Sequence, residues 1–158
     1  MLTKRVNEFL KKRTFLNVAT ATLDGKPNTV SKLILKVEDN FIYLVDYSIG
    51  RTYTNVKANP QVSLSFFDVE SLSGYQINGP VELIEKGPQF DAIKAELMEK
   101  EISLATERII KGVSSGHSHD KFELAPPKHF VIFKVRMEEI AEVAYSGEIK
   151  REKSYQKT

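Results

Sequence analysis

The sequence predicts a mainly β protein, an antiparallel barrel with flanking helices, and three observations support this fold class. Short runs rich in β-branched and aromatic residues follow one another with turn residues between them. Asp24-Gly25 separates two such runs, and this dipeptide is a strong hairpin signal because a tight turn needs positive φ. Helical patterns are too few to alternate with the strands of a doubly wound parallel sheet. We therefore expect about six strands in an antiparallel barrel.

The elements of the first half follow from apolar spacing. A short amphipathic helix is expected at the N-terminus, where Leu2, Val6 and Phe9 share one face that would dock on a core. The expected strands then cover residues 15–23, 29–37, 41–45, 62–67 and 75–84.

The second half contains one long helix and the last strand. Gly87-Pro88 begins a helical insertion expected over 88–112, since proline suits a first helical position and Gly112 is a natural stop. A polar loop follows, and a β run at 130–135 leads to residues 140–145. We expect one domain over 1–147, and a charged C-terminal tail over 148–158 that frays because it lacks an apolar face.

Composition excludes several classes of function. The chain has 158 residues, 41% of them hydrophobic, which suits one globular core. The net charge is only +2, which is smaller than the excess of basic residues that most nucleic-acid-binding proteins carry. The absence of cysteine rules out disulfides and thiolate chemistry. No apolar run suggests a signal peptide or a membrane span, so we expect a cytoplasmic protein.

The stretch from Phe41 to Leu64 has the layout of an anion site. A strand-like run ends in a polar turn, Gly50-Arg51-Thr52 follows, and a short helical segment stops at Asn59-Pro60. An arginine fork and the N–H groups of a helix start can bind phosphate oxygens. By itself this tripeptide is more often a solvated turn. Walker and GxGxxG patterns are absent, which disfavours nucleoside triphosphates and Rossmann-type dinucleotides.

The order of these motifs resembles the flavin-binding split-barrel family that includes pyridoxamine 5′-phosphate oxidase. The resemblance is carried by the segments 15–25, 31–36, 43–47, 50–52, 59–64 (Asn-Pro-Gln-Val-Ser-Leu) and 74–79 (Gly-Tyr-Gln-Ile-Asn-Gly). It implies a six-stranded split barrel that binds FMN noncovalently at the interface of a homodimer.

The resemblance also assigns binding roles. Arg51 and Thr52 would contact the FMN phosphate, with Lys57 as a secondary candidate, and Gln76 would reach the flavin from the partner subunit. The residues expected along the ring, ribityl chain and phosphate are Lys32, Leu33, Ile34, Leu35, Lys36, Val45, Asp46 and Tyr47. No residue is assigned as catalytic.

Two departures limit what the resemblance implies. Pyridoxamine phosphate oxidase itself has arginine at the position of Ser31 and a tryptophan-containing C-terminal segment, whereas this chain has no tryptophan. Vitamin B6 oxidation is therefore not expected.

Two classes of function stay open, together with a third in which an adaptor binds no cofactor. The first is a flavin-dependent oxidoreductase that takes electrons from a donor such as NAD(P)H for an unidentified small molecule. The second is a non-catalytic protein that binds or stores flavin, haem or deazaflavin. A metal site at His117-Ser-His119 is disfavoured, because the spacing is poor and no further ligands are near.

Overall fold

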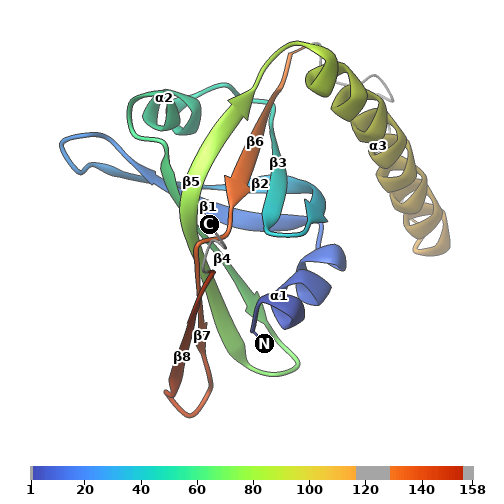
Figure 1. Cartoon of the computed structure of the whole chain (residues 1–158). Helices are drawn as coiled ribbons and strands as arrows, with labels where there is room; N and C mark the ends of the chain where they lie inside the picture. The colour runs from blue at the N-terminus through green and yellow to red at the C-terminus, as the bar shows by residue number, and fades with distance from the viewer. Residues whose placement is uncertain (1, 117–128, 155–158) are drawn as a thin grey trace. The chain divides into compact units, whose positions relative to one another are not determined.

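The computed structural model describes residues 2–116 and 129–154, and its elements fall into two units (Figure 1). One unit comprises the chain up to Ile84 together with the chain from Phe130 onward, and it contains all the described strands. The described residues of the second unit, Glu85–His129, contain one helix. Because the two units are not fixed relative to one another, each is described by itself.

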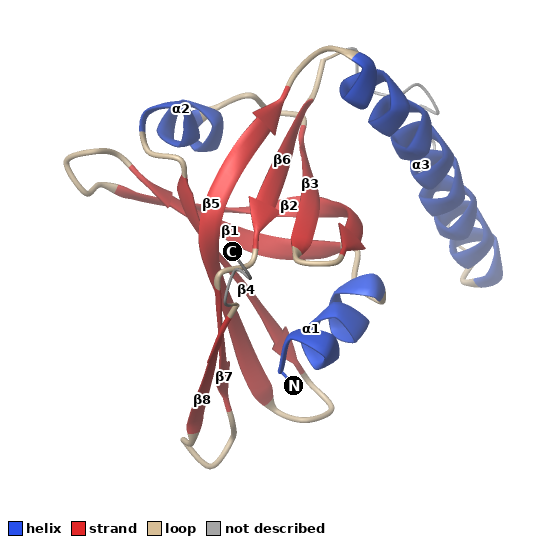
Figure 2. Ribbon diagram, in the orientation of Figure 1, coloured by secondary structure: helices blue, strands red, loops and turns tan. Residues whose placement is uncertain are grey.

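Six strands of the first unit close into an antiparallel barrel (Figure 2). The strands are β1 (Phe15–Ala21), β2 (Pro27–Glu38), β3 (Phe41–Asp46), β4 (Gln61–Asp68), β5 (Ser73–Ile84) and β6 (Val131–Arg136). They neighbour one another in the order β4-β1-β2-β3-β6-β5, and β5 pairs back with β4 to close the ring. The predicted mainly β fold, a six-stranded antiparallel barrel with flanking helices, is confirmed.

Strand β5 changes partners halfway along its length. Its first half pairs with β4 on one side and with β7 (Glu139–Val143) on the other, while its last residues pair with β6. Gly79 lies between the part of β5 that pairs with β7 and the part that pairs with β6, and the connection between β6 and β7 crosses β5 at this residue. A Cβ at this position would lie 1.8 Å from the carbonyl oxygen of Arg136, so only glycine allows the two backbones to come this close.

The strands bury their side chains in two patterns. In β4 the burial alternates along the strand, so that Val62, Leu64 and Phe66 point inward while the residues between them are more exposed. In β3, by contrast, every residue after Phe41 is buried. The largest completely buried side chains include Phe133, Leu64 and Ile77.

Two helices of the first unit lie at opposite ends of the barrel (Figure 1). Helix α1 (Leu2–Lys11) contacts β2 and β7, and its Val6 and Leu10 are fully buried, as the predicted docking face requires. Helix α2 (Arg51–Ala58) contacts β1 and β2 and buries Val56. Each helix therefore covers one mouth of the barrel with a small apolar face.

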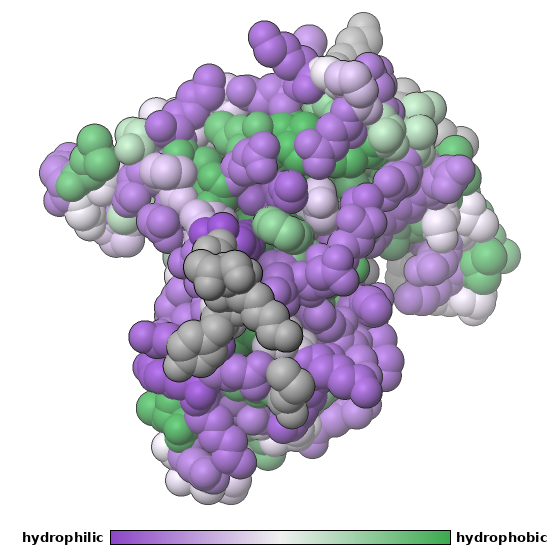
Figure 3. All heavy atoms as spheres, viewed as in Figure 1, coloured by the Kyte–Doolittle hydropathy of each residue, from purple (hydrophilic) through white to green (hydrophobic). Residues whose placement is uncertain are grey.

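The prediction of a fraying tail was wrong for residues 149–153. They form β8 (Ile149–Lys153), which pairs with β7 along its whole length across a turn where Gly147 has a φ of 84°. The strand is almost entirely exposed and charged, as edge strands often are, so no apolar alternation could indicate it. Figure 3 shows mostly hydrophilic residues over this hairpin. Residues 155–158 lie outside the described part of the chain.

The second unit contains α3 (Pro88–Ser114), a helix of 27 residues. It begins at the predicted Gly87-Pro88 and passes through Gly112, so it ends two residues beyond the predicted 88–112 range. Within the described residues, no helix is long and apolar enough to cross a membrane.

Candidate functional site

The turn between β3 and α2 has a strained backbone. Ile49 has a φ of 44°, in the left-handed region that β-branched residues rarely occupy. Strain of this kind costs about 1–3 kcal/mol and tends to occur at functional sites, where the surrounding structure holds it. The turn leads directly into Gly50 and the first residue of α2.

The N-terminus of α2 is a suitable place for an anion. Gly50 is the N-cap residue and provides no side-chain hydrogen bond, so the first N–H groups of the helix receive none from a cap. Arg51 is exposed, and its guanidinium has no hydrogen bond or ion pair with any residue in the described ranges. Thr52 is 4% exposed and accepts a hydrogen bond from Asn28 Nδ2 at 3.1 Å. Uncapped N–H groups and an unpaired arginine together form a local positive site.

A buried ion pair lies behind this turn. Lys32 donates to Asp46 Oδ1, and the two side chains are 5% and 0% exposed. The same carboxylate oxygen accepts the N–H of Ser48 at 3.1 Å and its hydroxyl at 2.9 Å. Asp46 Oδ2 is buried and has no hydrogen-bond partner in the described part of the chain. The pair therefore anchors the turn that begins at Ser48.

The structure brings together only part of the predicted set. Lys32, Asp46, Arg51 and Thr52 lie at one end of the barrel, around the start of α2. Lys36 is four residues further along β2, roughly 13 Å away, where its ammonium is 3.0 Å from Glu38 and 4.9 Å from the ring of Tyr43. It is not part of the cluster.

The remaining predicted residues divide between core and surface. Ile34 belongs to the barrel core, and Leu33, Leu35 and Val45 are also buried. Tyr47 is half-buried at the end of β3.

Lys57 and Gln76 lie apart from the start of α2. The ammonium of Lys57 lies 4.8 Å from the ring of Tyr53, in the last turn of the helix. Gln76 is exposed on the outer face of β5 and donates to Ser63 Oγ at 3.1 Å. Within a single chain, therefore, Gln76 is a surface residue of the barrel.

Sequence reasoning missed the polar residues that support the cluster. Ser48 contacts both members of the buried pair, with its hydroxyl 3.3 Å from Lys32 Nζ. Asp46-Tyr47-Ser48 has the spacing of an Asx turn, and this was the one local signal that could have identified Ser48. Asn28 and Asn55 bond to Thr52 and Thr20 across the barrel mouth, contacts that depend on tertiary structure.

The residues present fit the phosphate group of FMN. A phosphate dianion beside an ionised Asp46 would be repelled, but Lys32 neutralises this carboxylate inside the barrel. Arg51 and the uncapped helix N-terminus then give the surface of the turn a net positive potential. The flavin itself would need an apolar wall and backbone hydrogen-bonding groups, and the role predicted for Leu33 to Leu35 of β2 stays a prediction.

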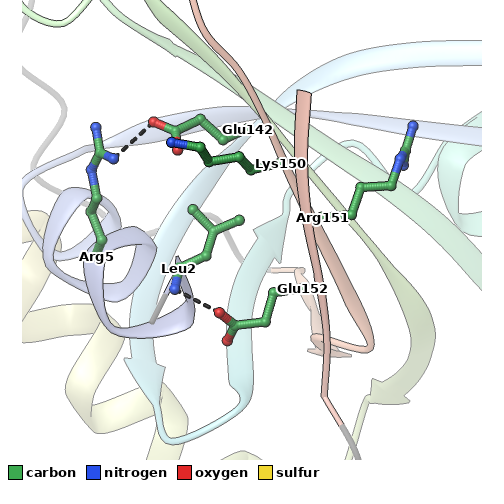
Figure 4. Close-up of a pocket in the computed structure, with 6 residues that line it drawn as sticks. All are labelled: Leu2, Arg5, Glu142, Lys150, Arg151 and Glu152. Carbon is green, nitrogen blue, oxygen red and sulfur yellow. Dashed lines mark hydrogen bonds and ion pairs between the residues drawn. The ribbon is translucent and has the colours of Figure 1, made fainter. Parts of the chain in front are cut away.

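A cavity of about 320 Å³ lies between α1 and the β7–β8 hairpin (Figure 4). Each of its charged side chains has a partner, and Lys150 and Arg151 pair with Glu148 and Glu139 outside the cavity. Arg5 lies 2.9 Å from Glu142, and Glu152 accepts the N–H of Leu2 at 2.7 Å. The hydroxyl of Thr3, followed by backbone N–H groups, holds the pKa of Glu152 below its usual value. These contacts attach α1 to the hairpin and do not resemble a ligand site.

No group of three or more potential metal ligands occurs in residues 2–116 and 129–154. The His117-Ser-His119 segment lies outside those ranges, so the prediction about it stays a prediction.

Comparisons with known proteins agree with this fold. Residues 2–144 match the family model described as pyridoxamine 5′-phosphate oxidase. No curated protein sequence matches the chain. A Clostridium acetobutylicum protein related to general stress protein 26 of B. subtilis shares 16% identity and a TM-score of 0.62, over 95% of this chain and 92% of that one.

Two further solved structures are similar in fold. A pyridoxamine 5′-phosphate oxidase-related, FMN-binding protein of Nostoc punctiforme shares 12% identity and a TM-score of 0.57, over 96% of this chain and 92% of that one. HutZ, the haem storage protein of Vibrio cholerae, shares 18% identity and a TM-score of 0.59, over 87% of this chain and 90% of that one. With its family model matched over 2–144, the chain belongs to the pyridoxamine 5′-phosphate oxidase family.

Proposed function

We propose that this protein binds FMN noncovalently, with the phosphate at the N-terminus of α2, and acts as a flavin-dependent oxidoreductase. The observation that carries the proposal is the uncapped start of α2 beside an arginine that has no partner in the described chain. In this arrangement Arg51 provides two parallel N–H donors to the phosphate, and the first backbone N–H groups of the helix provide more.

The buried pair and the strands have supporting roles in this proposal. Lys32 keeps Asp46 neutralised, and Asp46 holds the Ser48 turn so that α2 starts in the orientation the phosphate needs. The backbone of Leu33 to Leu35 would meet the polar edge of the flavin. Bound FMN supplies reversible transfer of a hydride or of single electrons, here between a donor such as NAD(P)H and a small molecule.

A homodimer belongs to the same proposal. The outer face of β1, β2, β4 and β5 is a contiguous area of small polar side chains, since the strand register places them side by side; they are Asn17, Ser31, Ser63, Ser65 and Gln76. Phe15 and Phe67, which are 57% and 51% exposed, lie along the same strands. We infer that a second subunit covers this area and that Gln76 reaches the flavin from there.

Vitamin B6 oxidation is not part of the proposal, because Ser31 replaces the arginine of that enzyme and the chain contains no tryptophan. The alternative is a non-catalytic protein that holds flavin or haem. Its support is the likeness to the haem storage protein of Vibrio cholerae, a likeness of fold.

The proposal is tested by replacing Arg51. Arg51→Ala removes a charge-assisted pair of hydrogen bonds, which contribute about 1.5–3 kcal/mol, so FMN should bind roughly 10- to 150-fold more weakly. Quenching of flavin fluorescence on titration measures the dissociation constant. Arg151→Ala, which removes an exposed arginine from β8, is the matched control and should leave affinity unchanged.

Equal FMN affinity in Arg51→Ala and wild type would contradict the phosphate site. Anaerobic addition of NADPH or NADH to the FMN-loaded protein then distinguishes the two classes of function. Rapid bleaching at 450 nm, roughly where oxidised flavin absorbs, is expected for the oxidoreductase, and a spectrum that stays unchanged favours storage.

A further inference from the structure

Helix α3 has an exposed apolar stripe. Met98, Ile102, Ile109 and Val113 are 43%, 56%, 38% and 78% exposed. Their spacing of four, seven and four residues places all four within roughly 60° of arc on a helix with about 3.6 residues per turn. Ile110, 62% exposed, lies at the edge of the stripe. The helix therefore presents a row of large apolar side chains to solvent for about four turns.

The stripe adjoins the buried face of α3 and extends beyond it. The buried residues of the helix are Ile93, Leu97, Ala105 and Gly112. Successive residues of a helix point about 100° apart, so Ile93 and Leu97 lie well away from the stripe, whereas Ala105 and Gly112 lie at its border. The apolar surface of α3 is therefore wider than its buried part, and the exposed remainder needs its own explanation.

We propose that α3 pairs antiparallel with α3 of a second copy of this chain through the stripe. The sequence of intervals, four-seven-four, is the same in both directions along the helix. A two-fold axis near residues 105 and 106 therefore places Met98 against Val113 of the partner subunit and Ile102 against Ile109 of the partner subunit. Every large side chain of the stripe then meets another one. At the centre lie two small residues, the exposed Thr106 and Ala105, which is only 6% exposed.

Charge complementarity favours the antiparallel direction. Glu101 and Arg108 lie seven residues apart on one flank of the stripe. Antiparallel pairing brings Glu101 beside Arg108 of the partner subunit, and the two-fold axis repeats the contact.

The two halves of α3 also differ in net charge, and this difference again favours the antiparallel direction. Residues 88–101 include four acidic and two basic residues, whereas residues 102–114 include one acidic and two basic residues. Antiparallel pairing therefore sets the acidic half against the basic half. This contact involves α3 alone, and it is independent of FMN and of the barrel face used in the proposed homodimer.

The test uses the absence of cysteine from the chain. Ile102→Cys and Ile109→Cys are made separately in the full chain, mixed, and oxidised. Because the two positions face each other, the mixture should yield the mixed disulfide, identified by mass spectrometry of the unreduced peptides. Each variant alone should give little disulfide, because identical positions are offset by roughly 10 Å along the axis, beyond the reach of the bond.

A control pair and a disruptive variant complete the test. Ser103→Cys mixed with Glu107→Cys introduces thiols on the opposite, exposed side of the helix and should not cross-link. Ile109→Glu should weaken self-association measured by sedimentation at least tenfold, with helix content by circular dichroism and FMN affinity unchanged. Efficient cross-linking of Ile102→Cys with itself would overturn the antiparallel arrangement. Absence of the mixed disulfide would overturn the pairing itself, and neither result would affect the proposed flavin site.

Discussion

At the scale of single residues, the pair of Lys32 and Asp46 joins the barrel core to the start of α2. Both side chains are buried, and Asp46 also accepts two hydrogen bonds from Ser48. Taking two charges out of water is costly, so such a pair adds little net stability, yet removal of one partner leaves the other charge unsatisfied. The pair therefore specifies the geometry of the turn more than it strengthens the fold.

Lys32→Met should destabilise the protein by about 3–5 kcal/mol, because it leaves the carboxylate of Asp46 buried without its cation. The double variant Lys32→Met/Asp46→Leu should recover most of that loss, since neither charge remains. Urea unfolding measures both values. If the double variant is as unstable as the sum of the two single variants, the charges do not interact as described.

Gly79→Ala should destabilise the barrel by about 1–3 kcal/mol or more, because its Cβ would lie 1.8 Å from the carbonyl oxygen of Arg136. Gly74 provides a matched control in the same strand, where an added Cβ meets only Phe67 Cδ2 at 3.9 Å. Thermal unfolding of Gly74→Ala should be close to that of wild type. Equal melting temperatures for the two variants would show that the β6–β7 corner can move away.

The sequence alone could predict residues whose chemistry is local. Arg51 and Thr52 were identified because they follow a strand and begin a short helix, and both positions are where that reading placed them. Lys32 and Asp46 were expected along the cofactor. The structure instead pairs them with each other, through a contact between β2 and β3 that spacing along one strand cannot reveal. Their direct contact with FMN stays a prediction.

At the scale of elements, α1 and β8 depend on each other. Glu152 of β8 accepts hydrogen bonds from the backbone N–H groups of Leu2 and Thr3, and so it caps the first turn of α1. The charged strand that sequence patterning missed is thus attached to the helix that patterning identified. Apolar periodicity is a signal of burial, and β8 has a structural role without burial.

Glu152→Ala should cost about 1 kcal/mol at neutral pH, as loss of a helix cap usually does. The pKa of Glu152 is held below its ordinary value of 4.5 by the hydroxyl of Thr3. A depressed folded-state pKa contributes stability that is present above 4.5 and is lost as the pH falls through the folded value.

The stability difference between wild type and Glu152→Ala should therefore shrink as the pH is lowered below about 4.5. Denaturant unfolding at a series of pH values measures it. Glu148→Ala is the control, because that exposed carboxylate makes only a 3.8 Å contact with Lys150. If the stability difference between wild type and Glu152→Ala stayed constant at every acidic pH at which the protein still folds, Glu152 would not act as the cap of α1.

At the scale of the whole molecule, the barrel was predictable because its strands are runs rich in β-branched and aromatic residues and its turns are marked. Asp24-Gly25 does lie in the turn between β1 and β2. The strands before and after α2, β3 and β4, coincide with the expected runs at 41–45 and 62–67 to within one residue at each end. The assembly was not predictable in the same way. The outer face of β1, β2, β4 and β5 is polar and shows no apolar pattern. The proposed partner of this face is a second subunit, whose contacts leave no periodic signal in the sequence of one chain.

Ser65→Arg should convert the proposed dimer to a monomer, because it places a large charge at the centre of that outer face. FMN affinity should fall at least tenfold in parallel if Gln76 of the partner subunit contributes to the site. Light scattering gives the mass and flavin fluorescence gives the affinity. Glu8→Arg, at an exposed position of α1, is the control for added charge. A dimeric Ser65→Arg with unchanged FMN affinity would contradict this interface.

The contact between Leu2 and Glu152 also bears on the order of folding. These residues are 150 positions apart, and closure of the ring requires β6, which follows α3 in the chain. Contacts of such long range are entropically costly to form and make folding slow. During synthesis, the hairpin of β1 and β2 can form early, but α1 cannot acquire its cap until the last strand has left the ribosome. Completion of this fold is therefore a late event, and it depends on the most charged and exposed strand of the molecule.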